Sequence, residues 1–189
     1  MVDFTSGSIP KHLLVFSIPL FLGNLLQALY NTVDSVWVGQ FLGANALASV
    51  TVGGPVIFAL VAMVTGVTMA TTTLVAQFYG AKEHDKVQVV IGNSLVLLLI
   101  LRIIVTIVGV AFSRTFLIWI NVPEEIFDDA ATYLSIFFTG MVANFMYNVV
   151  SAILRGLGDS RTPLKFLAIA SVINIILDPL FIFGFGPIP

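Results

Sequence analysis

Two aspartates, Asp34 and Asp178, lie inside long apolar stretches of the sequence. A charged side chain in the hydrocarbon core of a membrane is costly, so it is retained where it has a functional partner or ligand. Asn174 precedes Asp178 by one helical turn and shares its face. Carboxylate and amide oxygens suit a hard cation such as sodium, and two carboxylates held close together could instead share a proton. The sequence therefore predicts a cation or proton site at Asp34, Asp178 and Asn174.

Pro179 follows Asp178 directly and removes a backbone hydrogen bond from any helix that contains it. The carbonyl that it frees near the carboxylate could serve as a further oxygen ligand. The alternative is structural, with Asp178 capping a helix that breaks at Pro179. The sequence leaves both interpretations open.

Asp34 shares one face of the first apolar stretch with three amides, within an arc of about 80° at about 100° per residue. The amides are Asn24, Gln27 and Asn31, and Tyr30 lies near the edge of the arc. Such a polar face points toward protein or water rather than lipid. It either lines a cavity or joins helices through hydrogen bonds.

Hydrophobic residues form 58% of the 189-residue chain and charged residues 10%, which excludes an ordinary soluble domain. The apolar runs are long enough for helices to cross a bilayer and lack the alternation of barrel strands. We therefore expect an all-α integral membrane protein with the lipid bilayer as its surroundings. The second of its five spans is long for a single crossing, so it is tilted or extends past the interface. The predicted spans are residues 13–40, 46–79, 87–112, 130–154 and 164–184.

Charged residues are distributed unequally between the two sides of these spans. If the spans alternate in direction, one side is cationic and the other is mostly acidic. By the positive-inside rule the N-terminus is therefore cytoplasmic. The cationic side carries Lys11, Lys82, Lys86, Arg155, Arg161 and Lys165, and the other side carries Arg114, Glu124, Glu125, Asp128 and Asp129.

Other polar residues in the spans admit more than one role. Arg102 lies midway along the third span, where we expect it to pair with a carboxylate or face an aqueous cavity. In the fourth span Asn144, Asn148 and Ser151 share a face that either lines a cavity or packs helices. The threonines within 65–73 of the second span are more typical of close helix packing.

The residue types also exclude several kinds of chemistry. The chain has no cysteine and only two histidines, so thiolate chemistry is excluded and a histidine metal site is not expected. It has no phosphate-binding glycine loop and no hydrolase or metalloprotease motif. We expect no enzymatic activity, no cofactor, no nucleic-acid partner, and no metal beyond sodium at the aspartates.

Several short motifs follow one another along the chain. They are Pro19, DSVWVG at 34–39 with Gly43 and ALA at 46–48, VAQFYGA at 75–81, RGLGD at 155–159 with Thr162-Pro163, Asn174 to Pro179, and FGFG at 183–186. Each motif alone is weak, but their order and spacing are specific and cover nearly the whole chain. Together they resemble the N-terminal half of transporters of the multidrug and toxic compound extrusion (MATE) family, nearest to its DinF-like branch.

The resemblance implies two six-helix lobes and drug export by alternating access, driven by inward flow of sodium or protons. It implies that Asp34, Asp178 and Asn174 hold the coupling ion in the N-terminal lobe. Pro19 matches a proline at which the first helix bends. The residues that match a polar network of the lobe cavity are Gln27, Asn31, Tyr30, Tyr133 and Asn148.

From the same resemblance we expect residues 1–189 to be the N-terminal lobe of a longer multi-pass transporter of the cell membrane, truncated before the sixth helix. Its expected partners are a missing C-terminal lobe and small amphiphilic, often cationic substrates. The alternatives are a flippase for lipid-linked precursors from the same superfamily, a membrane interaction module without transport, and an intramembrane hydrolase that uses both aspartates.

Overall fold

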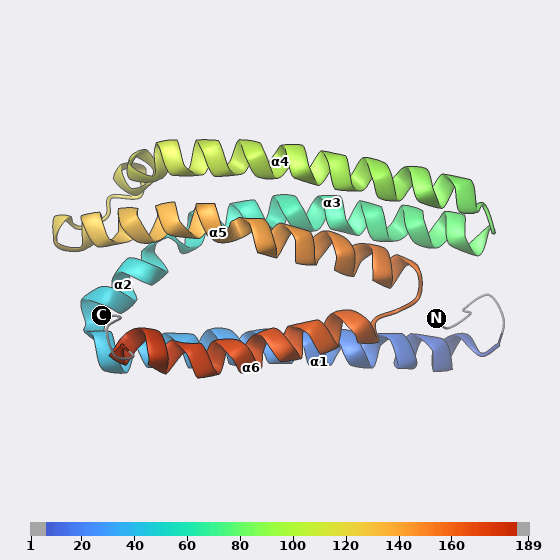
Figure 1. The fold of residues 1–189 in the computed structure, drawn as a ribbon, viewed down its shortest axis with the longest axis horizontal. Coiled ribbons are helices and arrows are strands. Elements are labelled where there is room, and N and C mark those ends of the chain that lie inside the picture. The colour runs from blue at the N-terminus through green and yellow to red at the C-terminus, as the bar shows by residue number, and fades with distance from the viewer. Residues whose placement is uncertain (1–6, 185–189) are drawn as a thin grey trace. The chain divides into compact units, whose positions relative to one another are not determined.

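The structure is a computed structural model that describes residues 7–184, apart from the side chain of Val142 (Figure 1). This part of the chain contains helices and no strand. The last two residues of the glycine-rich motif at 183–186 lie outside it. The α-helices are α1 (Ile9–Trp37), α2 (Gly43–Val52), α3 (Gly54–Gly80), α4 (His84–Trp119), α5 (Glu124–Gly156) and α6 (Arg161–Phe183), and a π-helical turn, η1 (Val38–Leu42), joins α1 to α2.

Judged by length and composition, four helical stretches in the described part of the chain are long and apolar enough to cross a membrane. They are 9–52, 54–80, 84–119 and 161–183. A fifth crossing results if the two parts of α5, Glu124–Met141 and Ala143–Gly156, form one span bent by 41°. The predicted all-α membrane class is thus confirmed. Helices α4 and α5 are longer than the predicted spans because a helix can continue past the apolar region that hydropathy detects.

The predicted second span, 46–79, is not one continuous helix. It is divided between α2 and α3, which meet at Gly53. Pro55 explains the break, since it lies in the first turn of α3 and has no N–H to continue a preceding helix. At the other end of α2, Gly43 has a φ of +88°, which favours glycine.

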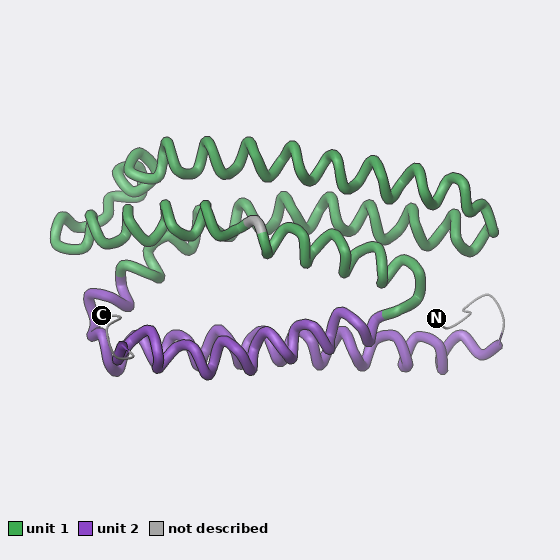
Figure 2. The backbone as a smooth tube through the Cα atoms, in the orientation of Figure 1, with its two compact units in different colours: residues 1–5, 49–159 green, residues 6–48, 160–189 purple. Residues whose placement is uncertain are grey.

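The chain divides into two compact units (Figure 2). Among the described residues, unit 1 comprises 49–159 and contains α3, α4 and α5. Unit 2 comprises 7–48 and 160–184 and contains α1, η1 and α6. Within the described residues, unit 2 is therefore built from two segments, 7–48 and 160–184, that lie on either side of unit 1 in the sequence.

In unit 1, helices α3, α4 and α5 pack against one another in pairs (Figure 1). Their core includes Phe138, Phe145 and Leu98, each at most 2% exposed. Gly109 of α4 lies directly against the ring of Phe138, where a Cβ atom would collide. Small residues allow helices to approach closely in this way, which increases their van der Waals contact.

Hydroxyl groups join the three helices of unit 1 at several levels. Thr71 donates to Ser94 Oγ at 2.9 Å, and Thr72 donates to the carbonyl of Ala152 at 3.0 Å. The hydroxyls of Thr65 and Thr73 instead donate to carbonyls of their own helix. These contacts agree with the packing role expected for the threonines of the second span.

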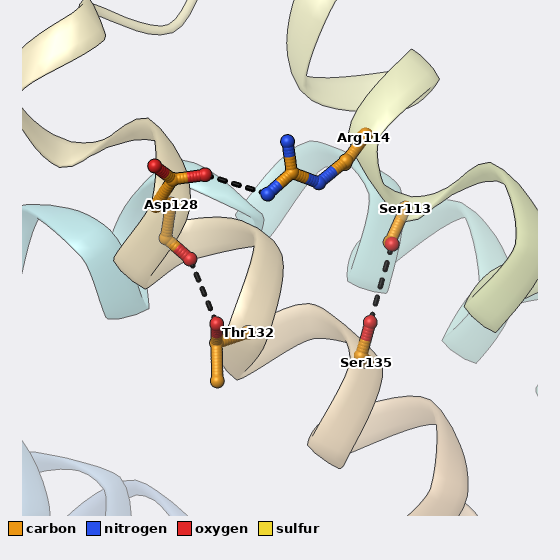
Figure 3. Close-up of polar contacts among 5 residues, drawn as sticks. All are labelled: Ser113, Arg114, Asp128, Thr132 and Ser135. Carbon is orange, nitrogen blue, oxygen red and sulfur yellow. Dashed lines mark hydrogen bonds and ion pairs between the residues drawn. The ribbon is translucent and has the colours of Figure 1, made fainter.

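Near the end of α4, Arg114 forms an ion pair with Asp128 of α5 at 2.6 Å, beside a contact of 3.2 Å between the hydroxyls of Ser113 and Ser135 (Figure 3). The two charged side chains are 67% and 83% exposed. Thr132 donates to the backbone carbonyl of Asp128, one turn away on the same helix (Figure 3).

Replacing Arg114 by Ala is expected to lower the free energy of unfolding by less than about 1 kcal/mol, because exposed ion pairs gain little over water. Thermal unfolding of the purified protein in detergent measures the change. Asp128→Ala is the matched control and should have the same small effect. A loss well above that limit in either variant contradicts the expectation.

Arg102 is half-buried near the middle of α4. Among the residues that the structure describes, it makes no ion pair with a carboxylate. The acidic side chains of unit 1 lie instead at helix ends, such as Glu83, Asp85 and Asp128. The structure therefore gives no support to a carboxylate partner for Arg102 within unit 1.

In unit 2, α1 and α6 pack along each other. A Cβ atom at Gly23 would lie 3.9 Å from side-chain atoms of Leu164 and Leu167. Further along both helices, the rings of Trp37 and Phe183 meet with centroids 6.3 Å apart. Because later residues of α1 meet later residues of α6, the two helices run parallel.

Candidate functional site

The parallel packing of α1 and α6 brings Asp34 and Asp178 together. Both side chains are partly buried. Gly23 of α1 lies opposite Leu164 and Leu167, and Trp37 lies opposite Phe183, so the two carboxylates lie at about the same level of this helix pair, with Tyr30 one turn before Asp34. Two adjacent carboxylates in an apolar unit repel one another unless a cation or a proton lies between them.

Asn174 connects to this pair through its side chain, which donates a hydrogen bond to the carboxylate of Asp178. Two oxygens nevertheless remain without a hydrogen-bond partner although they are buried: Oδ1 of Asn174 and Oδ2 of Asp178. A buried acceptor without a partner costs about 1–3 kcal/mol, and native proteins contain few of them. Their lone pairs are available to a cation or to a proton on the carboxylate.

Helix α6 continues through Pro179 to Phe183. The alternative in which Asp178 caps a helix break at Pro179 is therefore wrong. Because proline has no N–H, the carbonyl of Ile175 loses its helical donor and adds an acceptor on the turn that carries Asp178. This local effect was expected from the sequence, and it lies in the same unit as the carboxylates.

The residues on the polar face of α1 differ in how far they are buried. Asp34 and Tyr30 are partly buried, whereas Asn24, Gln27 and Asn31 are exposed. Contacts between α1 and α6 include Gly23, near the middle of α1, and the ring of Trp37 at its end. The amides are thus not the groups that hold α1 to α6, and the cavity-lining role of Gln27 and Asn31 stays a prediction.

Tyr133 and Asn148 belong to α5 in unit 1. The side-chain amide of Asn148 donates to the carbonyl and to Oδ1 of Asn144, at 2.8 and 2.7 Å, so this pair stays within one helix. Tyr133 is partly buried and lies next to Phe137, with ring centroids 6.1 Å apart. Their place in a polar network with Gln27, Asn31 and Tyr30 stays a prediction.

Pro19 is the buried residue of α1. Its missing N–H leaves the carbonyl of Val15 without a helical donor, which weakens the helix at this turn. The bending of α1 at Pro19 stays a prediction.

Ser171 is a further polar residue of this region of α6. This residue is 3% exposed, and its hydroxyl has no hydrogen-bond partner. It precedes Asn174 and Asp178 by about one and two helical turns, so the three side chains share a face of α6. The helical spacing was visible in the sequence, but a serine in an apolar span is common and its burial was not.

The donor set of the site consists of two carboxylates, an amide and a phenol. Within residues 7–184 no group of three or more His, Cys, Asp or Glu side chains gathers. Such oxygen donors suit hard cations rather than transition metals. The fold defines a multi-pass helical membrane protein, with two carboxylates inside its apolar helices.

The chain resembles curated proteins of known name over nearly its whole length. It is 39% identical over 180 residues to the probable multidrug resistance protein YpnP of Bacillus subtilis, and 33% identical over 182 residues to the probable multidrug resistance protein YoeA of the same organism. It is 28% identical over 184 residues to a FAD transporter of Shewanella oneidensis. These matches cover 95%, 96% and 97% of the chain but only 40%, 39% and 40% of the relatives.

Solved structures show the same partial coverage. A MOP superfamily transporter from Pyrococcus furiosus, described as having a binding pocket of reverse polarity, matches with a TM-score of 0.88 and 32% identity. A MATE protein in complex with MaL6 matches with a TM-score of 0.88 and 31% identity. Each match covers 96% of the chain and 40% of the solved structure.

The MatE family model matches residues 19–180. The chain therefore belongs to the MatE family, which confirms the predicted MATE resemblance. It spans about 40% of the length of the relatives it matches, in the manner of an N-terminal lobe. Its position in the DinF-like branch stays a prediction.

Proposed function

We propose that this chain is the N-terminal lobe of a secondary transporter that exports small amphiphilic, often cationic compounds in exchange for sodium ions or protons. The family and the multidrug-resistance names of its relatives support export of this kind. Because the chain spans about 40% of those relatives, a C-terminal lobe is the partner that completes the transporter.

One observation supports the proposal: Asp34 of α1 and Asp178 of α6 lie at about the same level of the helix pair, and buried oxygens of Asp178 and Asn174 have no hydrogen-bond partner. A bound cation or proton removes the repulsion between the carboxylates and satisfies these oxygens. It therefore stabilises the arrangement in which α1 and α6 are close at this level.

Substrate export is coupled to ion binding if the substrate binds more tightly to the arrangement in which α1 and α6 are apart at the aspartates. A ligand shifts a conformational equilibrium only by the difference in its affinity for the two states. Ion binding that draws α1 toward α6 at Asp34 changes the exposed polar face of α1, where Asn24, Gln27 and Asn31 lie. Pro19 provides a weakened turn about which the first part of α1 can move.

Efflux of a fluorescent cationic dye tests the proposal, in cells that express the complete reading frame containing this sequence. We expect these cells to lose dye faster than cells with an empty vector. Ionophores that dissipate both the sodium and the proton gradient should abolish the difference. Dye loss equal to the empty vector, or dye loss that persists without either gradient, contradicts the proposal.

A second candidate is the transport of an anionic compound, such as a lipid-linked precursor that carries phosphate. It is favoured by Arg102, which is half-buried at the middle of α4 and has no carboxylate partner in the described part of the chain. A FAD transporter and a pocket of reverse polarity occur among the similar proteins. The dye-efflux assay distinguishes the two candidate functions, because a transporter for anions leaves the cationic dye inside the cells.

A further inference from the structure

Three buried oxygens without a hydrogen-bond partner lie in a row along one face of α6. They are Oγ of Ser171, Oδ1 of Asn174 and Oδ2 of Asp178, and they are the buried side-chain atoms without a partner in the described part of the chain. The ion site proposed above uses the last two. Ser171, at 3% exposed, is the most deeply buried of the three residues and has no role in that site.

The spacing along the helix separates Ser171 from the carboxylates. At about 1.5 Å per residue, Ser171 lies about 4.5 Å before Asn174 and about 10 Å before Asp178. Oxygen ligands bind a hard cation of calcium size at about 2.3–2.6 Å, so two ligands of one ion are at most about 5 Å apart. Ser171 and Asp178 therefore cannot hold the same ion, but each can share one with Asn174.

The direction of the side chains supports two separate ion positions that share Asn174. Helical side chains lean toward the N-terminal end, so Asp178 leans toward Asn174 and Asn174 leans toward Ser171. The amide nitrogen of Asn174 donates to Asp178. Its oxygen is on the other side of the amide group and is unpaired, as is the hydroxyl of Ser171.

The level of Ser171 and the level of the aspartates differ in the ionisable residues near them. On α6 no ionisable residue lies between Lys165 and Asp178, and on α1 none lies between His12 and Asp34 except Tyr30. The level of Ser171 therefore offers only neutral oxygens. A hydroxyl and an amide can coordinate a metal cation but do not hold an excess proton near neutral pH. Neutral ligands also bind more weakly than the carboxylate pair, which suits a position that an ion passes through.

We propose that Ser171 and Asn174 form a second, transient sodium position, one turn closer than the aspartates to the N-terminal end of α6. This inference rests on the proposed ion-coupled transport and identifies sodium as the coupling ion. The N-terminal end of α6 carries Arg161 and Lys165, which belong to the side predicted to be cytoplasmic. Sodium that leaves Asp178 thus exchanges its carboxylate ligands for Asn174 Oδ1 and Ser171 Oγ before it enters the cytoplasm.

The test compares Ser171→Ala with Ser171→Thr, which keeps the hydroxyl, in proteoliposomes made with the complete reading frame. Loss of one neutral ligand should slow sodium-driven dye transport about threefold to tenfold in Ser171→Ala, the range expected for one lost polar contact. Equilibrium binding of radioactive sodium to the aspartate site should change less than about twofold. Ser171→Thr should retain the wild-type rate, and an unchanged thermal unfolding midpoint shows that both variants are folded.

Asp178→Asn distinguishes failure of this inference from failure of the proposed function. If Asp178→Asn abolishes sodium-driven transport but Ser171→Ala matches the wild type, the second position is refuted and the proposed function stands. If Asp178→Asn has no effect, the proposed function fails, and the second position fails with it. Transport driven by a proton gradient in the absence of sodium also overturns the inference, because the inference requires sodium as the coupling ion.

Discussion

Asp178→Asn is expected to uncouple dye efflux from the ion gradient and to reduce the gradient-dependent rate by about 5- to 150-fold, the usual range of coupling between two ligands. Asparagine keeps the size of the side chain but removes its charge. The repulsion with Asp34 then disappears whether or not an ion is bound, so ion binding no longer distinguishes the two arrangements of α1 and α6. Dye efflux from cells, measured with and without an imposed sodium or proton gradient, gives the result.

Asp34→Asn should have the same effect, because either substitution leaves a single carboxylate at the site. Asp128→Asn is the matched control, since Asp128 is a highly exposed residue near the start of α5 and pairs only with Arg114 among the described residues. It should retain coupled efflux at close to the wild-type rate. Coupled efflux that survives in both Asp34→Asn and Asp178→Asn contradicts a role for the acidic pair.

Gly156→Ala is expected to destabilise the protein by about 1–3 kcal/mol, the usual effect of overpacking a filled core. A Cβ atom at Gly156 would lie 2.7 Å from Cβ of Val75 and 2.9 Å from the backbone carbonyl oxygen of Thr72. Neither atom belongs to a flexible end of a side chain, so α3 and α5 must separate. The hydrogen bond from Thr72 to Ala152, one turn away on α5, lies at the same crossing. Thermal unfolding in detergent measures the loss.

Gly140→Ala provides a control of opposite sign on the same helix. No atom lies within 4 Å of a Cβ built at Gly140. Alanine favours a helix interior over glycine by about 1 kcal/mol, so this variant should be as stable as the wild type or more stable. If both glycine variants shift the unfolding midpoint equally, close packing at Gly156 is not the cause.

Much of the fold could be predicted from the sequence because its causes are local. Long apolar runs define helices that cross a membrane, and they do so without knowledge of their neighbours. The shared face of Asn174 and Asp178 follows from the helical repeat. The break at Gly53 was missed, although Pro55 marks it, because the sequence stays apolar across it and residues 46–52 were predicted to belong to the same span as 54–79.

Locating the candidate site required both the sequence and the tertiary structure. The sequence by itself determined the membrane class, the approximate spans and the presence of carboxylates and amides inside them, since composition and periodicity are properties of single segments. Only the tertiary structure decided that α1 and α6, which lie far apart in the sequence, pack directly against each other and so bring the carboxylates predicted to share a site into one helix pair. It also decided that Asn24, Gln27 and Asn31 are exposed while Ser171 is buried. Burial and pairing between distant segments depend on which faces pack together, and no local pattern encodes that choice.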